Sequence, residues 1–229
     1  MILFPSPIGR PGLPQSPLAP QSRVDAGGTA LAQGEAEIVL NWNGSHAHWP
    51  LKTNLLGPHN VENILAAIAV GVAAGIPVSA MRRALAAFRG VEHRLELVRT
   101  LRGVRYVNDS KGTNVDSTRV ALQSFSSPLI LILGGEGKGS PYAPLKSLVR
   151  ARVKRVLLIG EDAPRIAREL RAAAPMERLH HLARAVRRAR QVAEEGDVVL
   201  LSPACASFDQ YKNYEERGRR FKTLVRGLR

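Results

Sequence analysis

The chain is short of cysteine and of long apolar runs. Cys205 is the only cysteine among 229 residues, which excludes an internal disulfide and a cysteine-based zinc cluster. No apolar run approaches the roughly 20 residues that span a bilayer. The apolar start, Ile2 to Phe4, is too short for the core of a signal peptide before prolines begin. We therefore expect a cytoplasmic protein with no membrane partner.

Two further absences concern nucleotide and metal chemistry. The phosphate-binding P-loop reads G-x-x-x-x-G-K-[ST], whereas Gly137-Lys138 is followed by Gly139, so the sequence contains no P-loop. None of the six histidines has a second histidine four residues along the chain, the spacing that places two ligands on one helical face. We therefore predict no metal site in this chain.

The net charge of +14 is compatible with a polyanion or with acidic small molecules as partners. The arginines are scattered through predicted helices, and no basic strand interleaved with aromatics is present. We interpret them as solvated helix faces and expect no nucleic-acid partner. Charge-driven nucleic-acid binding stays open as an alternative, and it predicts an affinity that falls steeply with salt.

The pattern along the chain predicts an α/β protein in three parts. Residues 1–23 carry six prolines and are expected to be a disordered lead-in. Residues 24–95 read as a hairpin over 30–51 and two helices over 60–74 and 79–88. Residues 96–229 alternate strands, at 104–108, 128–133, 153–159 and 198–201, with helices. This alternation predicts a Rossmann-like, mostly parallel sheet, closed by a helix from about 207 to 226.

Polar clusters follow the predicted strands at 108–114, 134–139, 160–162 and 202–207. In open α/β sheets, ligands bind beyond the carboxyl ends of the strands. The clusters combine glycines, hydroxyls and two lysines, Lys111 and Lys138. Backbone N–H groups and ammonium charges can surround an anion, so the clusters favour a ligand with two carboxylates. Any one glycine-rich cluster could equally be a simple turn.

Several segments resemble, in order, the signatures of the Mur ligase family. They are Gly57 to Ala67, Glu92-His93-Arg94-Leu95-Glu96, Asn108 to Asn114, and Leu133 to Lys138. The stretch Ser202 to Gly218 is most similar to the family members that add D-glutamate. The resemblance implies an ATP-dependent ligase of peptidoglycan synthesis that joins D-glutamate to UDP-N-acetylmuramoyl-L-alanine through an acyl phosphate. It also identifies residues 24–95 as the tail of an α/β ATPase central domain and 96–229 as the C-terminal domain that holds the amino acid.

The resemblance implies roles for single residues. Lys111 is expected beside the transferring phosphate, where an ammonium offsets negative charge. The other roles are ATP contacts from Asn60, Asn63 and Arg94, with Asp109 on the ribose, and D-glutamate contacts from Thr113, Lys138, Ser207, Phe208 and Tyr214. Each has a simpler alternative: Asn60 could cap a helix, Phe208 and Tyr214 could be core aromatics, and Lys111 could be solvated. Cys205 is expected to be a small buried packing residue.

The sequence departs from the family pattern in what it lacks. It has no counterpart of the UDP-binding domain, the P-loop or the central-domain ligands of Mg²⁺. We therefore expect a monomer that is catalytically incomplete on its own, with its magnesium ligands in the missing part. Two alternatives stay open: a fragment similar to folylpolyglutamate synthase, and a non-catalytic module that binds an acidic ligand.

Overall fold

The computed structural model describes residues 30–31, 35–42, 45–52, 55 and 59–229, with side chains for Leu55 and residues 60–229. The chain divides into two compact units, one ending at Arg89 and the other running from Gly90 to Arg229. The predicted lead-in, residues 1–23, and the predicted hairpin turn, residues 43–44, lie outside the described residues. The family assignments of 24–95 and 96–229 stay predictions.

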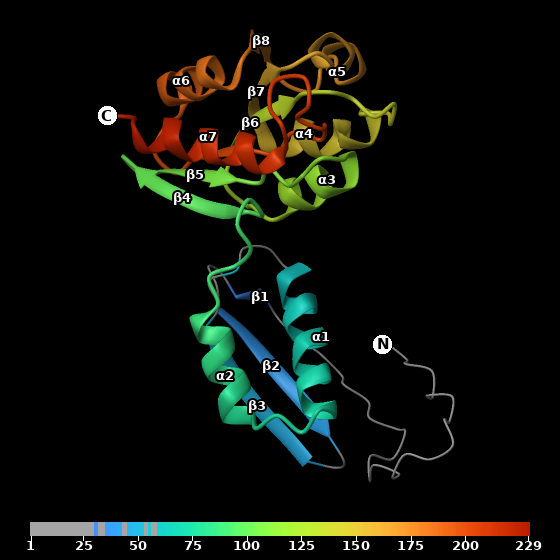
Figure 1. The fold of residues 1–229 in the computed structure, drawn as a ribbon, viewed down its shortest axis with the longest axis vertical. Coiled ribbons are helices and arrows are strands. Elements are labelled where there is room, and N and C mark those ends of the chain that lie inside the picture. Colours follow the sequence, from blue (N-terminus) through green and yellow to red (C-terminus); the bar gives the residue numbers. More distant parts are fainter. Residues whose placement is uncertain (1–29, 32–34, 43–44, 53–54, 56–58) are drawn as a thin grey trace. The chain divides into compact units, whose positions relative to one another are not determined.

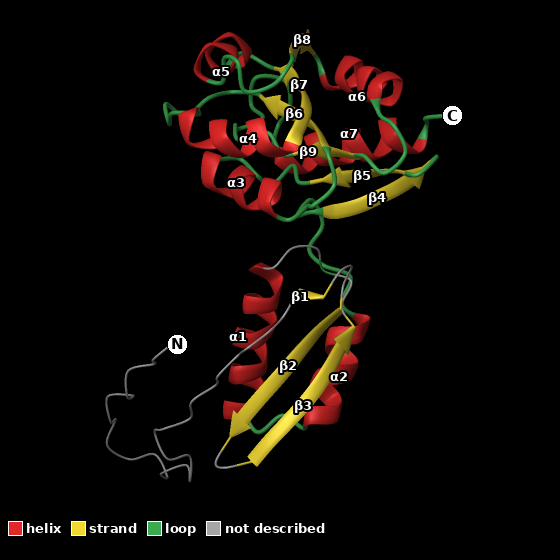
Figure 2. Ribbon diagram, turned by 180° about the vertical axis from the view of Figure 1, so that it is seen from behind, coloured by secondary structure: helices red, strands yellow, loops and turns green. Residues whose placement is uncertain are grey.

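The first unit combines an antiparallel sheet with two helices. Its strands, in order β1-β2-β3, are β1 (Ala30–Leu31), β2 (Glu35–Trp42) and β3 (Ser45–Lys52). Helices α1 (His59–Ala73) and α2 (Val78–Ala87) lie on one face of this sheet (Figures 1 and 2). Ile64, Ile68 and Met81 form a small core between them. A side chain at Gly71 would meet the Met81 sulfur at 2.5 Å, so this glycine permits the close approach of the helices.

The second unit is built on a six-stranded sheet in the order β4-β5-β9-β6-β7-β8. The edge strand β4 (Glu96–Leu101) runs antiparallel to β5 (Val104–Asn108). The other neighbours are parallel: β9 (Val198–Leu201), β6 (Leu129–Gly134), β7 (Val153–Ile159) and β8 (Met176–His180). The predicted fold class, an α/β protein with a mostly parallel sheet, is confirmed.

Helices cover both faces of this sheet. On one face lie α3 (Val115–Gln123), the short 3-10 turn η1 (Ala143–Leu145) with α4 (Lys146–Arg152), and α5 (Ala163–Glu169). On the other lie α6 (Leu182–Val192) and α7 (Tyr214–Arg226) (Figure 1). The chain steps from β5 to β6, β7 and β8 in one direction and returns to β9. Because parallel crossovers are right-handed, the reversal of direction moves α6 to the opposite face.

Successive side chains of each strand point to opposite faces of the sheet, and this alternation explains the core. Ile130, Ile132, Val199 and Leu201 face α6 and α7, where Phe221 of α7 packs against them. The residues between them, such as Leu131 and Leu200, are also fully buried. A parallel sheet with both faces covered requires such continuous apolar strands, which is why the sequence revealed β6, β7 and β9.

Two sequence-based assignments need correction. Strand β8 was not predicted, because Met-Glu-Arg-Leu-His is largely polar, as an edge strand can be. The last helix begins at Tyr214 rather than near Ser207. Residues 207–213 form turns, and Asn213 caps the helix by accepting a hydrogen bond from the Glu216 N–H at 2.9 Å. The predicted helix N-terminus beside Ser207 is therefore wrong.

None of the helices in the described part of the chain is both long and apolar enough to traverse a bilayer.

Tyr106 on β5 gives a test of the core. Its side chain is fully buried against α6 and α7, and its hydroxyl finds no hydrogen-bond partner among the described residues. A buried unpaired hydroxyl costs on the order of 1 kcal/mol, so Tyr106→Phe should raise the free energy of unfolding by about that amount in urea denaturation. A clear loss of stability would show that the hydroxyl is paired.

Candidate functional site

The candidate site lies where β5, β9 and β6 end. These strands are neighbours and run in the same direction, so the loops 109–114, 202–213 and 135–142 share one edge of the sheet. The fourth predicted polar cluster, residues 160–162, follows the parallel strand β7 at the same edge, and its Asp162 N–H donates to the Gly135 carbonyl at 3.0 Å. All four predicted polar clusters therefore lie at this edge. This is the edge at which open parallel sheets bind ligands.

Arg217 joins two of these loops from α7. Its side chain is 1% exposed. Its guanidinium donates to the Ser110 hydroxyl and carbonyl, both at 3.0 Å, and to the carbonyls of Ala206 (3.0 Å) and Cys205 (3.2 Å). Burial lowers the pKa of Arg217 to about 10, so the group stays charged at neutral pH. Backbone carbonyls, rather than a paired carboxylate, stabilise this charge.

Sequence reasoning did not select Arg217, although a signal was present. Arg217, Phe221 and Val225 follow each other at intervals of four residues, and residues at that spacing share one face of a helix. All three are buried. A charged residue that continues the apolar face of a helix is a candidate for a buried polar network.

Asp109 ties the same loops from β5. Its Oδ1 accepts from the Leu95 N–H at 3.3 Å, and its Oδ2 accepts from the Ser202 hydroxyl at 2.7 Å. Burial raises the pKa of Asp109 to about 6. The carboxyl is 5% exposed and turned into the protein. The predicted ribose contact stays a prediction, and the geometry favours a role for Asp109 in joining the loops.

Lys111 and Tyr214 lie together beside these ties. The Lys111 ammonium is 5.7 Å from the centre of the Tyr214 ring, within cation–π range, and the Lys111 N–H donates to the His93 carbonyl at 3.0 Å. A side chain at Gly112 would meet Asp109 Oδ2 at 2.5 Å and Ser202 Oγ at 2.8 Å. Glycine is therefore needed between Lys111 and Thr113, and both of these side chains are half-buried.

The loops that carry Lys138 and Ser207 are held side by side. Glu136 and Ala206 exchange two backbone hydrogen bonds, at 3.1 and 2.9 Å. Ser207 is buried, whereas the Lys138 side chain is exposed. Phe208 is 67% exposed, so the reading of Phe208 as a core aromatic is wrong. A large exposed aromatic next to a polar site is available to a ligand.

One acidic group in this region was not singled out from the sequence. The Oε2 atom of Glu136 is buried and has no hydrogen-bond partner within the described part of the chain. In the sequence, Glu136 could have been noticed only as an acidic residue within a glycine-rich loop.

His93 and Arg94 form the turn that leads into β4. His93 is buried with a φ of 64°, and its Nδ1 accepts from the Asn108 amide at 2.9 Å. Burial lowers the pKa of His93, so the ring is neutral at physiological pH. A side chain at Gly218 would meet this ring at 2.2 Å. Arg94 is exposed next to the turn.

Glu92, His93 and Glu96 bring three potential metal ligands within 4.8 Å of one another. The Lys222 ammonium already binds one oxygen of each glutamate at 2.7 Å. The second Glu96 oxygen accepts from Asn108 at 3.0 Å. The cluster is thus an ion-paired network between the turn and α7, and these residues do not fit a Mg²⁺ ion.

Asn60 and Asn63 belong to the first unit. They lie one turn apart on α1, and the Asn63 amide donates to Asn60 Oδ1 at 3.1 Å.

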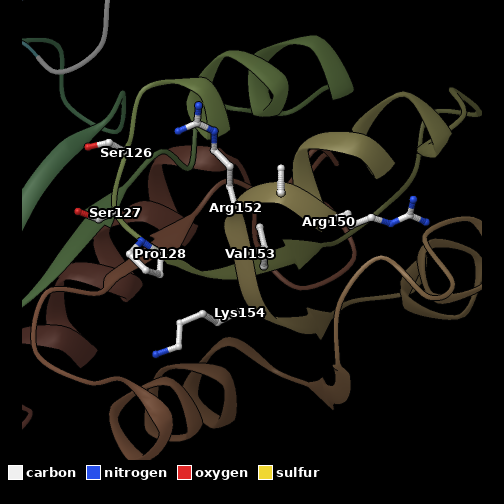
Figure 3. A pocket seen from close by; sticks show the side chains of 8 residues that line it. Ser126, Ser127, Pro128, Arg150, Arg152, Val153 and Lys154 are labelled. Carbon is white, nitrogen blue, oxygen red and sulfur yellow. The ribbon is translucent and has the colours of Figure 1, made fainter.

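A hollow of about 350 Å³ lies at the opposite edge of the sheet (Figure 3). Arg150, Arg152 and Lys154 line it but point in different directions (Figure 3). The Arg152 guanidinium donates to the Phe125 carbonyl, and the Lys154 ammonium pairs with Glu194 and Asp197. Arg152 and Lys154 are thus bound to other parts of the protein, and the three cations do not converge on a ligand (Figure 3).

Residues 93–205 match the family model described as "Mur ligase, glutamate ligase domain". The chain is 47% identical over 221 residues to the UDP-N-acetylmuramoylalanine–D-glutamate ligase of Myxococcus xanthus, covering 96% of this chain and 46% of that protein. The ligase of the same name from Koribacter versatilis is 54% identical over 199 residues, covering 86% of this chain and 41% of that protein. The chain thus spans about half the length of these relatives.

Solved structures agree on the fold. UDP-N-acetylmuramate-alanine ligase MurC from Thermotoga maritima aligns with a TM-score of 0.63 and 21% identity, over 85% of this chain and 44% of that one. A MurF structure from Acinetobacter baumannii aligns with a TM-score of 0.65 and 18% identity, over 88% of this chain and 44% of that one. At these identities the likeness concerns the fold.

Arg217 should dominate the stability of the site. Arg217→Met would leave the carbonyls of Ser110 and Cys205 buried and without their Arg217 donor, each at a cost of about 1–3 kcal/mol. We expect a loss of roughly 3 kcal/mol or more in urea denaturation. Arg219→Met, an exposed arginine of α7 that makes no side-chain bond among the described residues, should stay within about 0.5 kcal/mol of wild type. Equal effects of the two changes would contradict this role.

Asp109 should give a pH-dependent stability. The folded protein holds the Asp109 proton up to a pKa of about 6, whereas the unfolded chain releases it near 3.8. Protonation therefore favours folding below pH 4, and this advantage is lost as the pH rises to 6. Between pH 4 and 7, wild type should lose about 2 kcal/mol relative to Asp109→Asn.

The matched control for Asp109 is Asp116→Asn, because the Asp116 carboxylate is 85% exposed on α3. Asp116→Asn should change the free energy of unfolding by no more than about 0.5 kcal/mol, as is usual for an exposed position. A constant difference between wild type and Asp109→Asn would mean that the Asp109 pKa is ordinary.

Proposed function

We propose that the chain belongs to the Mur ligase family, whose model matches residues 93–205, and that it is the D-glutamate-binding part of a UDP-N-acetylmuramoylalanine–D-glutamate ligase. The observation that carries the proposal is sequence identity of 47–54% to ligases of that name over most of this chain. Three polar loops meet at one edge of the sheet, and they support the proposal because they offer a place where D-glutamate could bind.

The proposed reaction has two steps. ATP phosphorylates the carboxylate of UDP-N-acetylmuramoyl-L-alanine, which yields an acyl phosphate and ADP. The D-glutamate amine then attacks the acyl carbon, and the tetrahedral intermediate expels phosphate to leave an amide. Lys111 is proposed to stabilise the charge on the transferring phosphoryl group. The half-buried position of Lys111 against Tyr214 supports this role.

The amino-acid pocket is proposed at Thr113, Lys138, Ser207, Phe208 and Tyr214. A dicarboxylate needs cationic and hydroxyl partners. The Lys138 ammonium is exposed and makes no ion pair within the described part of the chain, and Thr113 and Ser207 carry hydroxyls on adjacent loops. The exposed Phe208 ring offers an apolar contact for the methylenes of the ligand.

Asn60, Asn63 and Arg94 are retained as proposed nucleotide contacts. A relative of similar fold, the MurF ligase of Thermotoga maritima, has been solved in complex with ADP. The same proposal includes ATP as the cosubstrate, a cytoplasmic location and a monomeric state. It also includes a requirement for turnover: segments of the relatives that this chain does not span. The magnesium ligands are proposed to lie in those other segments.

Calorimetric titration with D-glutamate, L-glutamate and ATP tests the pocket. We expect binding that prefers D-glutamate, weakened at least tenfold by Lys138→Met because a charge-assisted hydrogen bond is lost. Arg150→Met removes one positive charge at the opposite edge of the sheet and should leave the affinity unchanged. A preference for L-glutamate would favour a folylpolyglutamate-synthase-like activity, and equal affinity for both would contradict the proposal.

A further inference from the structure

The loop that carries Lys138 is held from outside by α5. Arg165, in the middle of that helix, donates from Nη2 to the carbonyls of Gly139 at 2.9 Å and Ser140 at 3.1 Å. These are the two residues that follow Lys138. The other side of the guanidinium, Nε, donates to Glu169 Oε1 at 2.9 Å, so Arg165 itself is fixed in place.

Tyr142 anchors the far end of the same loop. Its N–H donates to Glu169 Oε2 at 2.5 Å, and its hydroxyl donates to Asp162 Oδ2 at 2.5 Å. The hydroxyl also lies 2.9 Å from the Cys205 sulfur, and the Arg165 guanidinium lies 5.4 Å from the centre of the tyrosine ring. Burial raises the pKa of the Tyr142 hydroxyl, which keeps it protonated as a donor.

The near end of the loop contacts Asp162, the residue that directly precedes α5. The Asp162 N–H donates to the Gly135 carbonyl at 3.0 Å. A side chain at Gly137 would meet Asp162 Oδ2 at 1.9 Å, so the backbone on the amino side of Lys138 packs directly against this carboxylate. The loop is therefore held on both sides of Lys138, while the Lys138 side chain itself is exposed.

We propose that Asp162, Arg165 and Tyr142 form a latch that fixes the 135–142 loop, and that Arg165 and Tyr142 are positioning residues that act through Lys138 on the affinity for a dicarboxylic amino acid. This inference rests on the proposed function. A loop ordered before binding spares the ligand the entropy cost of ordering it. With the latch broken, the same Lys138 contact forms from a mobile loop and yields weaker binding.

The rate at which Cys205 reacts with a thiol reagent measures whether the latch is closed, and no ligand is needed. Cys205 is fully buried against Tyr142, and burial raises the pKa of its thiol to about 11, so reaction with an aromatic disulfide reagent should be slow. Tyr142→Phe and Arg165→Gln should each speed the labelling several-fold. Arg168→Gln, at an exposed arginine on the same helix, should label at the wild-type rate. Unchanged rates in the two latch variants would overturn the proposal.

A double-mutant cycle on D-glutamate affinity tests action through Lys138. Arg165→Gln should weaken binding about tenfold in the chain that keeps Lys138, and less than twofold in Lys138→Met. Arg165→Lys, which keeps the charge but loses the forked donors, should fall between wild type and Arg165→Gln. An equal loss in both backgrounds would show a general structural effect and would overturn the positioning role.

The two proposals fail in different ways. If wild type binds neither enantiomer of glutamate, the proposed function fails for this chain. Labelling then still decides the latch: faster labelling in Tyr142→Phe supports it, and an unchanged rate overturns it. If D-glutamate binds and Arg165→Gln binds it equally well, the proposed function stands and the positioning role is wrong.

Discussion

The candidate site depends on one buried cation without a carboxylate partner. Burying a guanidinium is costly unless its donors are satisfied, and Arg217 satisfies them with one hydroxyl and three carbonyls taken from two loops. Those carbonyls belong to residues 110, 205 and 206, which flank Lys111 and Ser207. The same hydrogen bonds that make the burial of Arg217 tolerable therefore set the backbone on which the predicted ligand contacts stand. A carboxylate partner would have satisfied the charge but fixed neither loop.

The third loop obeys a different constraint, close backbone approach. Gly134 and Gly135 have φ values of 119° and 141°, and side chains there would meet the carbonyls of Ile159 and Ala206 at 2.0 and 2.3 Å. Where it leaves the sheet, the loop packs closely between the backbone at Ile159 and at Ala206. Helix α5 then holds the outer part of the loop. Two of the loops are thus fixed from α7 and the third from α5, on opposite faces of the sheet. A site held from both faces is ordered before any ligand arrives, as selective binding requires.

Much of the fold was readable because the central strands are buried on both faces, which leaves an unbroken apolar run in Leu129–Leu133 and Val198–Leu201. Strand β8 was missed because an edge strand needs no such run. The start of α7 was misplaced because residues 207–213 form turns instead of helix. The N–H groups of Gln210 and Tyr211 donate to the Ser207 carbonyl, and the residue types in this segment do not distinguish such turns from a helix. The candidate site residues were chosen from their motifs, and their roles stay predictions. The inward turn of Asp109 could not be predicted, since it depends on Leu95 and Ser202, which lie 14 and 93 residues away.

The motifs contain two kinds of residue, buried ones that bind other parts of the protein and accessible ones. Asp109, Ser110 and Arg217 are at most 5% exposed and bind other parts of the protein, whereas Lys111, Phe208 and Tyr214 lie beside them with accessible surface. Burial shifts the pKa of Asp109 and of Arg217 toward neutrality, a cost borne within the fold. The accessible residues keep polar and aromatic surface that a ligand could contact. A motif of consecutive residues therefore combines side chains that bind the rest of the protein with side chains left at the surface, and the burial of each residue separates the two groups.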